Sequence, residues 1–154
     1  MGAIFTAAFE DVSVTAAQDF FELLAGSANP CEIRRVRLSS GKLTSEAVRI
    51  TINRITGSPT SGSGGSTPTI RKTSTTFGSA TATVEANNTS RNSGGTKETL
   101  YNEEWNWIVP FEWVPQDDKG QSEIPAGKYF TVGLEAAPGA STKVSGWIEW
   151  EEKG

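Results

Sequence analysis

Residues 46–56, EAVRITINRIT, alternate apolar and polar side chains with a period of two. Val48, Ile50 and Ile52 share one parity, and polar side chains occupy the positions between them. Successive side chains of a β-strand point to opposite faces, whereas the apolar residues of an amphipathic helix recur every three or four positions. The segment therefore predicts a strand with one buried face.

Shorter runs of the same kind recur along the chain, separated by turn residues. Besides 46–56, they predict strands over residues 3–9, 30–40, 79–86, 128–139 and 143–152. The aromatic segment 98–118 contains Pro110, so two short strands or one bent edge strand are expected there. Eight or nine strands in 154 residues are typical of one all-β domain, residues 1–154, folded as an antiparallel β-sandwich or jelly roll.

The segment 16–24 has two interpretations. Thr15 could cap a helix whose apolar stripe contains Phe20, Leu23 and Leu24. Alternatively, Asp19–Leu24 forms a strand with Phe21 and Leu23 on one face. Propensity does not decide between them, and we favour the strand because the neighbouring segments are strands.

Two long polar loops are predicted, at residues 57–69 and 87–97. The first belongs to TGSPTSGSGGSTPT, which is almost entirely Gly, Ser, Thr and Pro. Too few strands flank it for two domains, so we expect a long hairpin-tip loop within one domain. Loops of this length are commonly functional, and glycine allows close backbone approach. We therefore expect this loop to contact another subunit, with the candidate contact residues Ser61, Gly62, Gly64 and Gly65.

The N-terminal segment 1–10, MGAIFTAAFE, is apolar and lies at a terminus. It is interpreted as an arm that docks on a partner. Its candidate contact residues are Ile4, Phe5 and Phe9.

Five tryptophans are the most informative residues. Trp105, Trp107 and Trp113 share one parity, so part of that segment should fill the core. In the last strand Trp147 lies opposite in parity to Ile148 and should point away from the core. Aromatic side chains on a solvent face mark protein interfaces or sugar platforms. The candidate contact residues are Trp105, Trp113 and Trp147.

Residues that carry catalytic chemistry are scarce. The chain has no His and one Cys, so Cys31 cannot form an internal disulfide and has no imidazole base to activate it. Cys31 is expected to be a buried structural thiol. Zinc lacks sufficient ligands, and the acidic segment 116–123, QDDKGQSE, is expected to be a solvated turn rather than a calcium site. We therefore expect that this chain is not an enzyme and that it has no catalytic, cofactor-binding or metal-ligating residue.

Charge and hydropathy argue against nucleic acid and membranes as partners. A net charge of −4 argues against nucleic-acid binding, and the basic run Arg34–Arg37 is expected to pair with acidic side chains. No stretch approaches the roughly 20 apolar residues of a membrane span. The start of the chain lacks the basic region of a signal peptide, so synthesis in the cytoplasm is expected.

Four segments resemble a family of small β-rich structural proteins encoded by tailed phages and prophages. They are FEDVSVTAAQDFFELLAGSANPCEIRRVRLS, RITINRITGSPTSGSGGSTPTIRK, EANNTS and IPAGKYFTVGLEAAPGASTKVSGWIEWEE. The resemblance covers nearly the whole chain, and its motifs are loop and turn patterns. Such proteins look like capsid decoration, or cement, proteins.

The resemblance implies a protein on the capsid exterior of a virion, made in the bacterial host cytoplasm. It also implies a homotrimer that binds the major capsid protein and stabilises the head shell. A tail or neck component is the nearest alternative. From a different class, a carbohydrate-binding module for host attachment would use exposed tryptophans.

Overall fold

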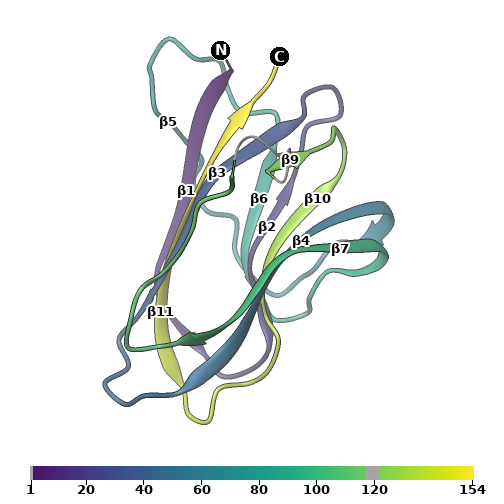
Figure 1. Ribbon diagram of the computed structural model, residues 1–154. Helices are drawn as coiled ribbons and strands as arrows, with labels where there is room; N and C mark the ends of the chain where they lie inside the picture. Colours follow the sequence, from purple (N-terminus) through teal and green to yellow (C-terminus); the bar gives the residue numbers. More distant parts are fainter. Residues whose placement is uncertain (1, 117–121) are drawn as a thin grey trace.

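The computed structural model describes residues 2–116 and 122–154 and shows an all-β protein made of two packed antiparallel sheets (Figure 1). Sheet A has the order β5–β1–β11–β3–β8, and β9 also pairs with β3. Its strands are β1 (Ala3–Val14), β3 (Cys31–Ser40), β5 (Arg71–Lys72), β8 (Phe111–Trp113), β9 (Glu123–Ile124) and β11 (Thr142–Glu152). The predicted β-sandwich is confirmed.

Sheet B has the order β6–β2–β10–β4–β7. Its strands are β2 (Gln18–Leu24), β4 (Ala47–Thr60), β6 (Thr83–Asn88), β7 (Ser93–Asn106) and β10 (Tyr129–Leu134). The most regular sequence segment, 46–56, lies in β4, where Val48, Ile50 and Ile52 are buried against sheet A.

Four strand pairs are nested along the chain. β4 pairs with β7, β3 with β8, β2 with β10 and β1 with β11, all antiparallel. The chain is therefore one long hairpin wound into two sheets, which is the topology of a jelly roll. The short strands β5, β6 and β9 are additions to this eight-stranded frame.

Aromatic side chains join the two sheets through the core. Phe9 of β1 lies 6.2 Å from Phe20 and 5.1 Å from Phe21 of β2, measured between ring centroids. Trp113 of β8 stacks 6.0 Å from Phe130 of β10. These rings bury large apolar areas, and that burial is the dominant stabilising contribution to such a fold.

The ambiguous segment 16–24 is the strand β2, as favoured. A β-bulge at Phe20 shifts the register between β2 and β10, since Val132 pairs with Phe21 and Gly133 with Asp19. The bulge lets consecutive phenylalanines both contact Phe9, which a regular strand would not allow. This irregularity explains why the apolar pattern could also be interpreted as a helix.

The prediction of a docking arm at residues 1–10 is wrong. Most of this segment is strand β1, which lies inside sheet A between β5 and β11. Phe5 and Phe9 are buried in the core. The strand pairs with β11 along its length and with β5 at Phe5 and Thr6, so its backbone is hydrogen-bonded within the domain and it is not a free arm.

The predicted loop 87–97 is also wrong. Asn87 and Asn88 end β6, and residues 93–97 begin β7, which leaves 89–92 as the connection. The two glycines, Gly94 and Gly95, adopt positive φ within β7, beside a register shift against β4. Their composition is that of a loop, but pairing with β4 holds them in a strand.

The Gly/Ser-rich loop is shorter than predicted and is not a hairpin tip. Residues 57–60 extend β4, and residues 61–70 cross from sheet B to β5 of sheet A. On the way the segment forms single bridges from Ser63 to Ser90 and from Ser66 to Ala86, along the outer edge of β6. We call residues 61–70 the crossover loop; it covers an otherwise open sheet edge.

Other predicted boundaries need smaller changes. Pro110 separates β7 from β8, and these two strands belong to different sheets. The strand predicted at 79–86 begins only at Thr83, and the one predicted at 128–139 ends at Leu134. The solvated turn predicted at 116–123 lies largely outside the described residues.

Candidate functional site

Two of the three candidate tryptophans are core residues. Trp105 is 2% exposed and Trp113 is 7% exposed. The ring centroids of Trp105 and Trp107 lie 4.9 Å apart, and the indole Nε1 of Trp105 donates to the carbonyl oxygen of Val109 at 2.6 Å. The expectation that these two indoles contact a partner is therefore wrong, because they fill the space between the sheets.

Trp147 lies on the outer face of sheet A, as its parity predicts. Its neighbour Ile148 is fully buried, whereas Trp147 is half-buried. It pairs across the sheet with Ala8 of β1 on one side and Arg37 of β3 on the other. Among the candidates from the N-terminal segment, only Ile4 shares this outer face; it is half-buried.

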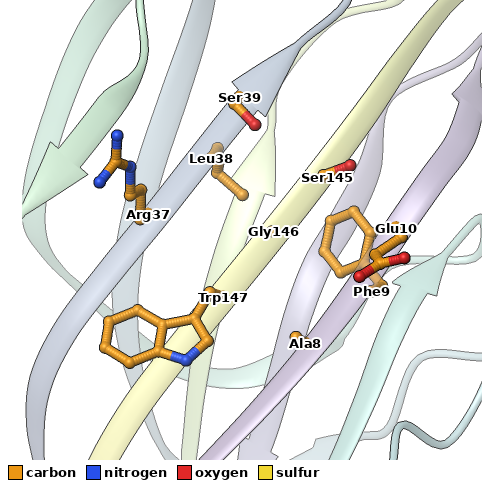
Figure 2. Close-up of a pocket in the computed structure, with 9 residues that line it drawn as sticks. All are labelled: Ala8, Phe9, Glu10, Arg37, Leu38, Ser39, Ser145, Gly146 and Trp147. Carbon is orange, nitrogen blue, oxygen red and sulfur yellow. The ribbon is translucent and has the colours of Figure 1, made fainter.

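Two shallow hollows flank Trp147 on this outer face. One, of about 220 Å³, is also lined by Arg37, Ser39 and Ser145 (Figure 2). The other, of about 330 Å³, lies between β1 and β5 and is also lined by Thr6, Thr69 and Arg71. Ala8, Phe9 and Glu10 contribute to both hollows. Small side chains next to the indole leave this part of the sheet uncovered.

The candidate residues of the crossover loop bind the chain's own β-strands. The backbone N–H of Gly62 donates to Glu22 Oε2 at 2.9 Å, and the Ser61 hydroxyl donates to the other carboxylate oxygen. Gly65 lies so close to β6 that a Cβ there would overlap the carbonyl oxygen of Ala86. Gly64 has φ of 83°, a conformation that favours glycine. Close backbone approach was predicted, but its target is β6 of the same chain.

Three buried carboxylates fasten loops to the sheets, and the sequence patterns did not reveal them. Glu22 holds the crossover loop, and Glu152 accepts from the backbone N–H groups of Thr81 and Ala82. Asp19 accepts from the backbone N–H of Asn92 at 2.8 Å. Buried carboxylates are rare in cores unless they are satisfied in this way.

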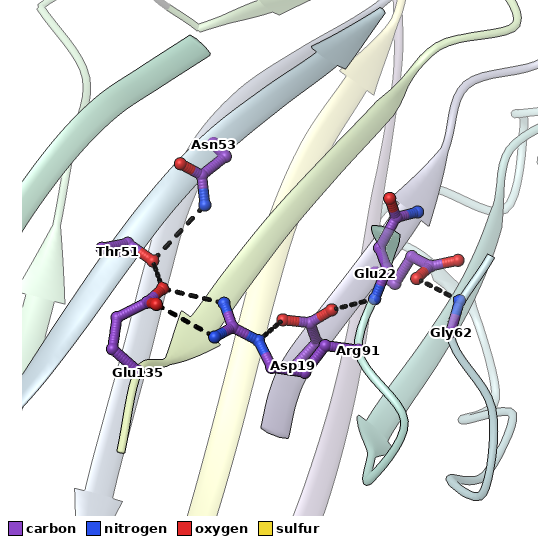
Figure 3. A network of polar contacts seen from close by, with 8 residues as sticks. Asp19, Glu22, Thr51, Asn53, Gly62, Arg91 and Glu135 are labelled. Carbon is purple, nitrogen blue, oxygen red and sulfur yellow. Dashed lines mark hydrogen bonds and ion pairs between the residues drawn. The ribbon is translucent and has the colours of Figure 1, made fainter. Parts of the chain in front are cut away.

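Asp19 belongs to a polar network that runs across β2, β4 and the end of β10, the inner strands of sheet B (Figure 3). Arg91 Nε donates to Asp19 at 2.9 Å, and the other guanidinium nitrogens donate to both oxygens of Glu135 at 3.0 and 2.8 Å. Burial raises the pKa of Asp19, although hydrogen bonds from Asn92 and Arg91 oppose this. The hydrogen bonds from Arg91 lower the pKa of Glu135. The network fixes the 89–92 connection and has the character of a structural clamp.

Three exposed apolar side chains lie on two loops at one end of the sandwich. Leu43, in the β3–β4 loop, is 95% exposed, and Ile108 and Val109, in the β7–β8 turn, are about half exposed. The two loops are joined by hydrogen bonds from Trp107 N–H to Glu46 and from the Ser40 hydroxyl to Trp107. We call Leu43, Ile108 and Val109 the apolar tip.

Cys31 is buried, as predicted, and burial raises the pKa of its thiol to about 12. Across residues 2–116 and 122–154, no group of three or more His, Cys, Asp or Glu side chains is placed to hold a metal ion. The same residues contain no helix long and apolar enough to cross a membrane. The basic run is partly paired: Arg34 contacts Glu151, and Arg35 lies 3.5 Å from Glu112.

Comparison with known proteins adds no relative: no family model, curated protein or solved structure matches the chain. The function is therefore inferred from the exposed surfaces of the protein. Two surfaces of the described residues stand out. One is the apolar tip, and the other is the outer face of sheet A with Trp147, Glu10, Arg37 and Arg71, which we call the Trp147 face.

Proposed function

We propose that this chain is a capsid decoration protein of a tailed phage, which binds the outside of the head shell and stabilises it. The partner is the major capsid protein, and the protein binds as a homotrimer after synthesis in the host cytoplasm. The chain's resemblance to small phage β proteins supports this role, and jelly rolls are common among viral capsid domains. A fold alone does not decide function, so the apolar tip carries the argument.

The apolar tip is the single observation on which the proposal rests. An isolated exposed leucine needs no explanation, but the apolar tip places three exposed apolar side chains, Leu43, Ile108 and Val109, on two loops that are joined by hydrogen bonds. Burying such side chains against another protein stabilises a complex through the hydrophobic effect.

The loops that carry the apolar tip are ordered before binding. The β7–β8 turn is closed by a hydrogen bond from Val109 N–H to Asn106 O at 3.1 Å. Asn106 also donates to the Ser45 hydroxyl at 2.9 Å, and Gly139 N–H donates to Glu46 at 2.6 Å. A surface that is already ordered loses less conformational entropy when it binds.

The apolar tip lies at the end of the sandwich opposite the chain termini (Figure 1). In a trimer, three such ends facing one way could contact the shell together. Specific interfaces usually bury about 1,200 Å² or more in total, which a single loop end does not readily supply. Three linked contacts raise the overall affinity without requiring a large individual interface.

The experiment uses heads, free of this protein, from the phage that encodes the chain. Cosedimentation should show saturable binding of the wild type, and light scattering should give three times the 16.4 kDa chain mass. The double variant Leu43→Asp/Ile108→Asp should bind at least tenfold more weakly while remaining folded, since both side chains are exposed. Ser27→Asp/Ala28→Asp, at two exposed positions in the β2–β3 loop, is the charge-matched control.

Immunogold labelling of virions separates decoration from the tail or neck alternative. Label spread over the head supports a decoration protein. Label confined to the neck or tail would contradict that role and support a neck or tail component. Unchanged binding by the double variant would contradict the role of the apolar tip.

A further inference from the structure

Three charged side chains that line the hollows of the Trp147 face have no partner among the described residues. Arg35, on the same face, pairs with Glu112. In contrast, within residues 2–116 and 122–154, the side chains of Arg37, Arg71 and Glu10 make no hydrogen bond or ion pair. These polar groups surround a half-buried indole and are available to a ligand.

A backbone irregularity positions Glu10 at the rim of both hollows. The register between β1 and β11 shifts between Phe9 and Val12, so Glu10 and Asp11 together oppose Ser145. Asp11 has φ of 54°, an unfavourable conformation for a residue with a side chain. Its N–H donates to the Ser145 hydroxyl at 3.0 Å, and Lys143 Nζ donates to its carbonyl oxygen at 2.9 Å. Such bulges re-aim side chains and are frequent beside binding sites.

The hollow in Figure 2 lies over the strand segment around Gly146, beside the bulge. Between its polar lining residues are Phe9, Leu38 and Gly146, and a Cβ at Gly146 would point into the core against the ring of Phe9. The indole of Trp147 extends from β11 toward β3, the strand that carries Arg37, and Glu10 lies on the opposite side of the hollow. The floor is therefore apolar, while a hydrogen-bond donor and an acceptor stand at its rim.

We propose that the Trp147 face binds a neutral oligosaccharide. The apolar C–H face of a sugar ring stacks on the indole, as in other aromatic recognition sites. Sugar hydroxyls both donate and accept, so they match Arg37 or Arg71 as donors and Glu10 as acceptor. The two hollows share Glu10, so together they hold two arginines and one carboxylate. Glu149, on the same outer face of β11 and paired with Thr6, brings the sum of these charges to zero, which favours an uncharged ligand over an anionic one.

The two hollows on either side of Trp147 indicate a chain of sugars rather than a single ring. One unit would stack on the indole, and its neighbours would extend toward Arg37 and toward Arg71. This binding is separate from shell binding, because it uses the outer face of sheet A and not the apolar tip.

Isothermal titration and intrinsic fluorescence of the full chain test the proposal. The probes are neutral hexasaccharides of glucose, mannose, galactose and N-acetylglucosamine, with hexagalacturonate as the anionic comparison. At least one neutral probe should bind saturably, with a blue shift in the tryptophan emission. Trp147→Ala should weaken this binding at least 20-fold, and Arg37→Ala or Glu10→Gln about fivefold.

Trp147→Tyr should restore part of the affinity, because a tyrosine ring also stacks on sugars. Trp105→Phe, a buried substitution, is the fluorescence control and should leave the affinity unchanged. The proposal is overturned if no neutral probe binds, if Trp147→Ala binds as the wild type does, or if only hexagalacturonate binds. Circular dichroism confirms that each variant is folded.

Discussion

The backbone N–H of Gly62 donates a hydrogen bond to the buried carboxylate of Glu22 at 2.9 Å, across 40 residues of sequence. This bond and the bond from the Ser61 hydroxyl hold the start of the crossover loop against β2. A segment with the composition of a flexible linker is thereby fixed to the domain. The position of the start of the loop depends on the side chain of Glu22, which makes this contact testable.

Replacing Glu22 by Ala should loosen the start of the crossover loop, at Ser61 and Gly62. The loss of two hydrogen bonds to a buried carboxylate should lower the free energy of unfolding by about 2 kcal/mol. Limited proteolysis should then cleave within residues 61–70 faster than in the wild type, with urea unfolding as the measure of stability. Glu98→Ala, at an exposed carboxylate, is the control. Equal cleavage of the wild type and Glu22→Ala would show that Glu22 does not hold the loop.

Gly65→Ala should destabilise the protein, whereas Gly78→Ala should not. A Cβ at Gly65 would overlap the backbone of Ala86, and rigid backbone cannot yield as a flexible side chain can. We expect a loss of about 1–3 kcal/mol at Gly65, in the range of overpacked sites. A Cβ at Gly78 meets nothing within 4 Å, so its unfolding midpoint should change little. Equal midpoints for the two variants would show that the loop does not pack on β6.

The Arg91–Glu135 pair should make stability depend on pH in the acid range. Arg91 lowers the pKa of Glu135 below its ordinary value of 4.5 in the folded state. This contribution is therefore present above pH 4.5 and is lost as the pH falls through the folded-state pKa. Glu135→Gln should remove it, so that the stability difference between wild type and variant shrinks as the pH falls below 4.5.

Asp19 contributes with the opposite sign, because burial raises its pKa. Subtracting the Glu135→Gln profile from that of the wild type cancels the Asp19 contribution to a first approximation. Urea unfolding at a series of pH values between 3 and 7 provides the measurement. A stability difference that stayed constant over that range would contradict the assignment.

Cys31 should be unreactive in the folded protein. Its thiol is buried and its pKa is raised to about 12, so almost no thiolate exists at pH 8. Modification by a disulfide reagent should be fast in urea and very slow in native buffer, at a rate set by unfolding. Rapid modification under native conditions would show that the Cys31 end of β3 opens locally.

Trp105→Ala and Trp147→Ala should differ strongly in stability. Removing the buried indole of Trp105 should cost about 3–5 kcal/mol. The half-buried Trp147 leaves no enclosed cavity, so its variant should lose about 1 kcal/mol. Thermal or urea unfolding of both variants provides the comparison. Similar losses would mean that Trp147 is also part of the core.

The regular strands were predictable because local alternation reports a buried face. Residues 46–56 and 143–152 follow that rule, and both are strands whose apolar parity is buried. The rule also placed Trp147 outside the core. It failed for Phe9 and Trp105 because alternation tells which residues share a face but not whether another sheet covers that face.

The loops were less predictable because their order comes from distant side chains. Glu22, Asp19 and Glu152 resemble ordinary surface acids in the sequence, yet each binds backbone N–H groups that lie far along the chain. The Gly94–Gly95 pair is typical of a turn, but pairing with β4 makes it part of strand β7. No local pattern encodes such partners.

The sequence by itself determined that this protein consists mainly of strands, which side chains of its main strands share a face, and that it has no His. Each of these follows from residue identity or from the two-residue period of a strand. Only the tertiary structure decided the nested pairing of β1 with β11 and of β4 with β7, the crossover loop and the surroundings of Trp147. These depend on contacts between residues far apart in the chain, and local physical preferences carry no information about which distant strand becomes the neighbour.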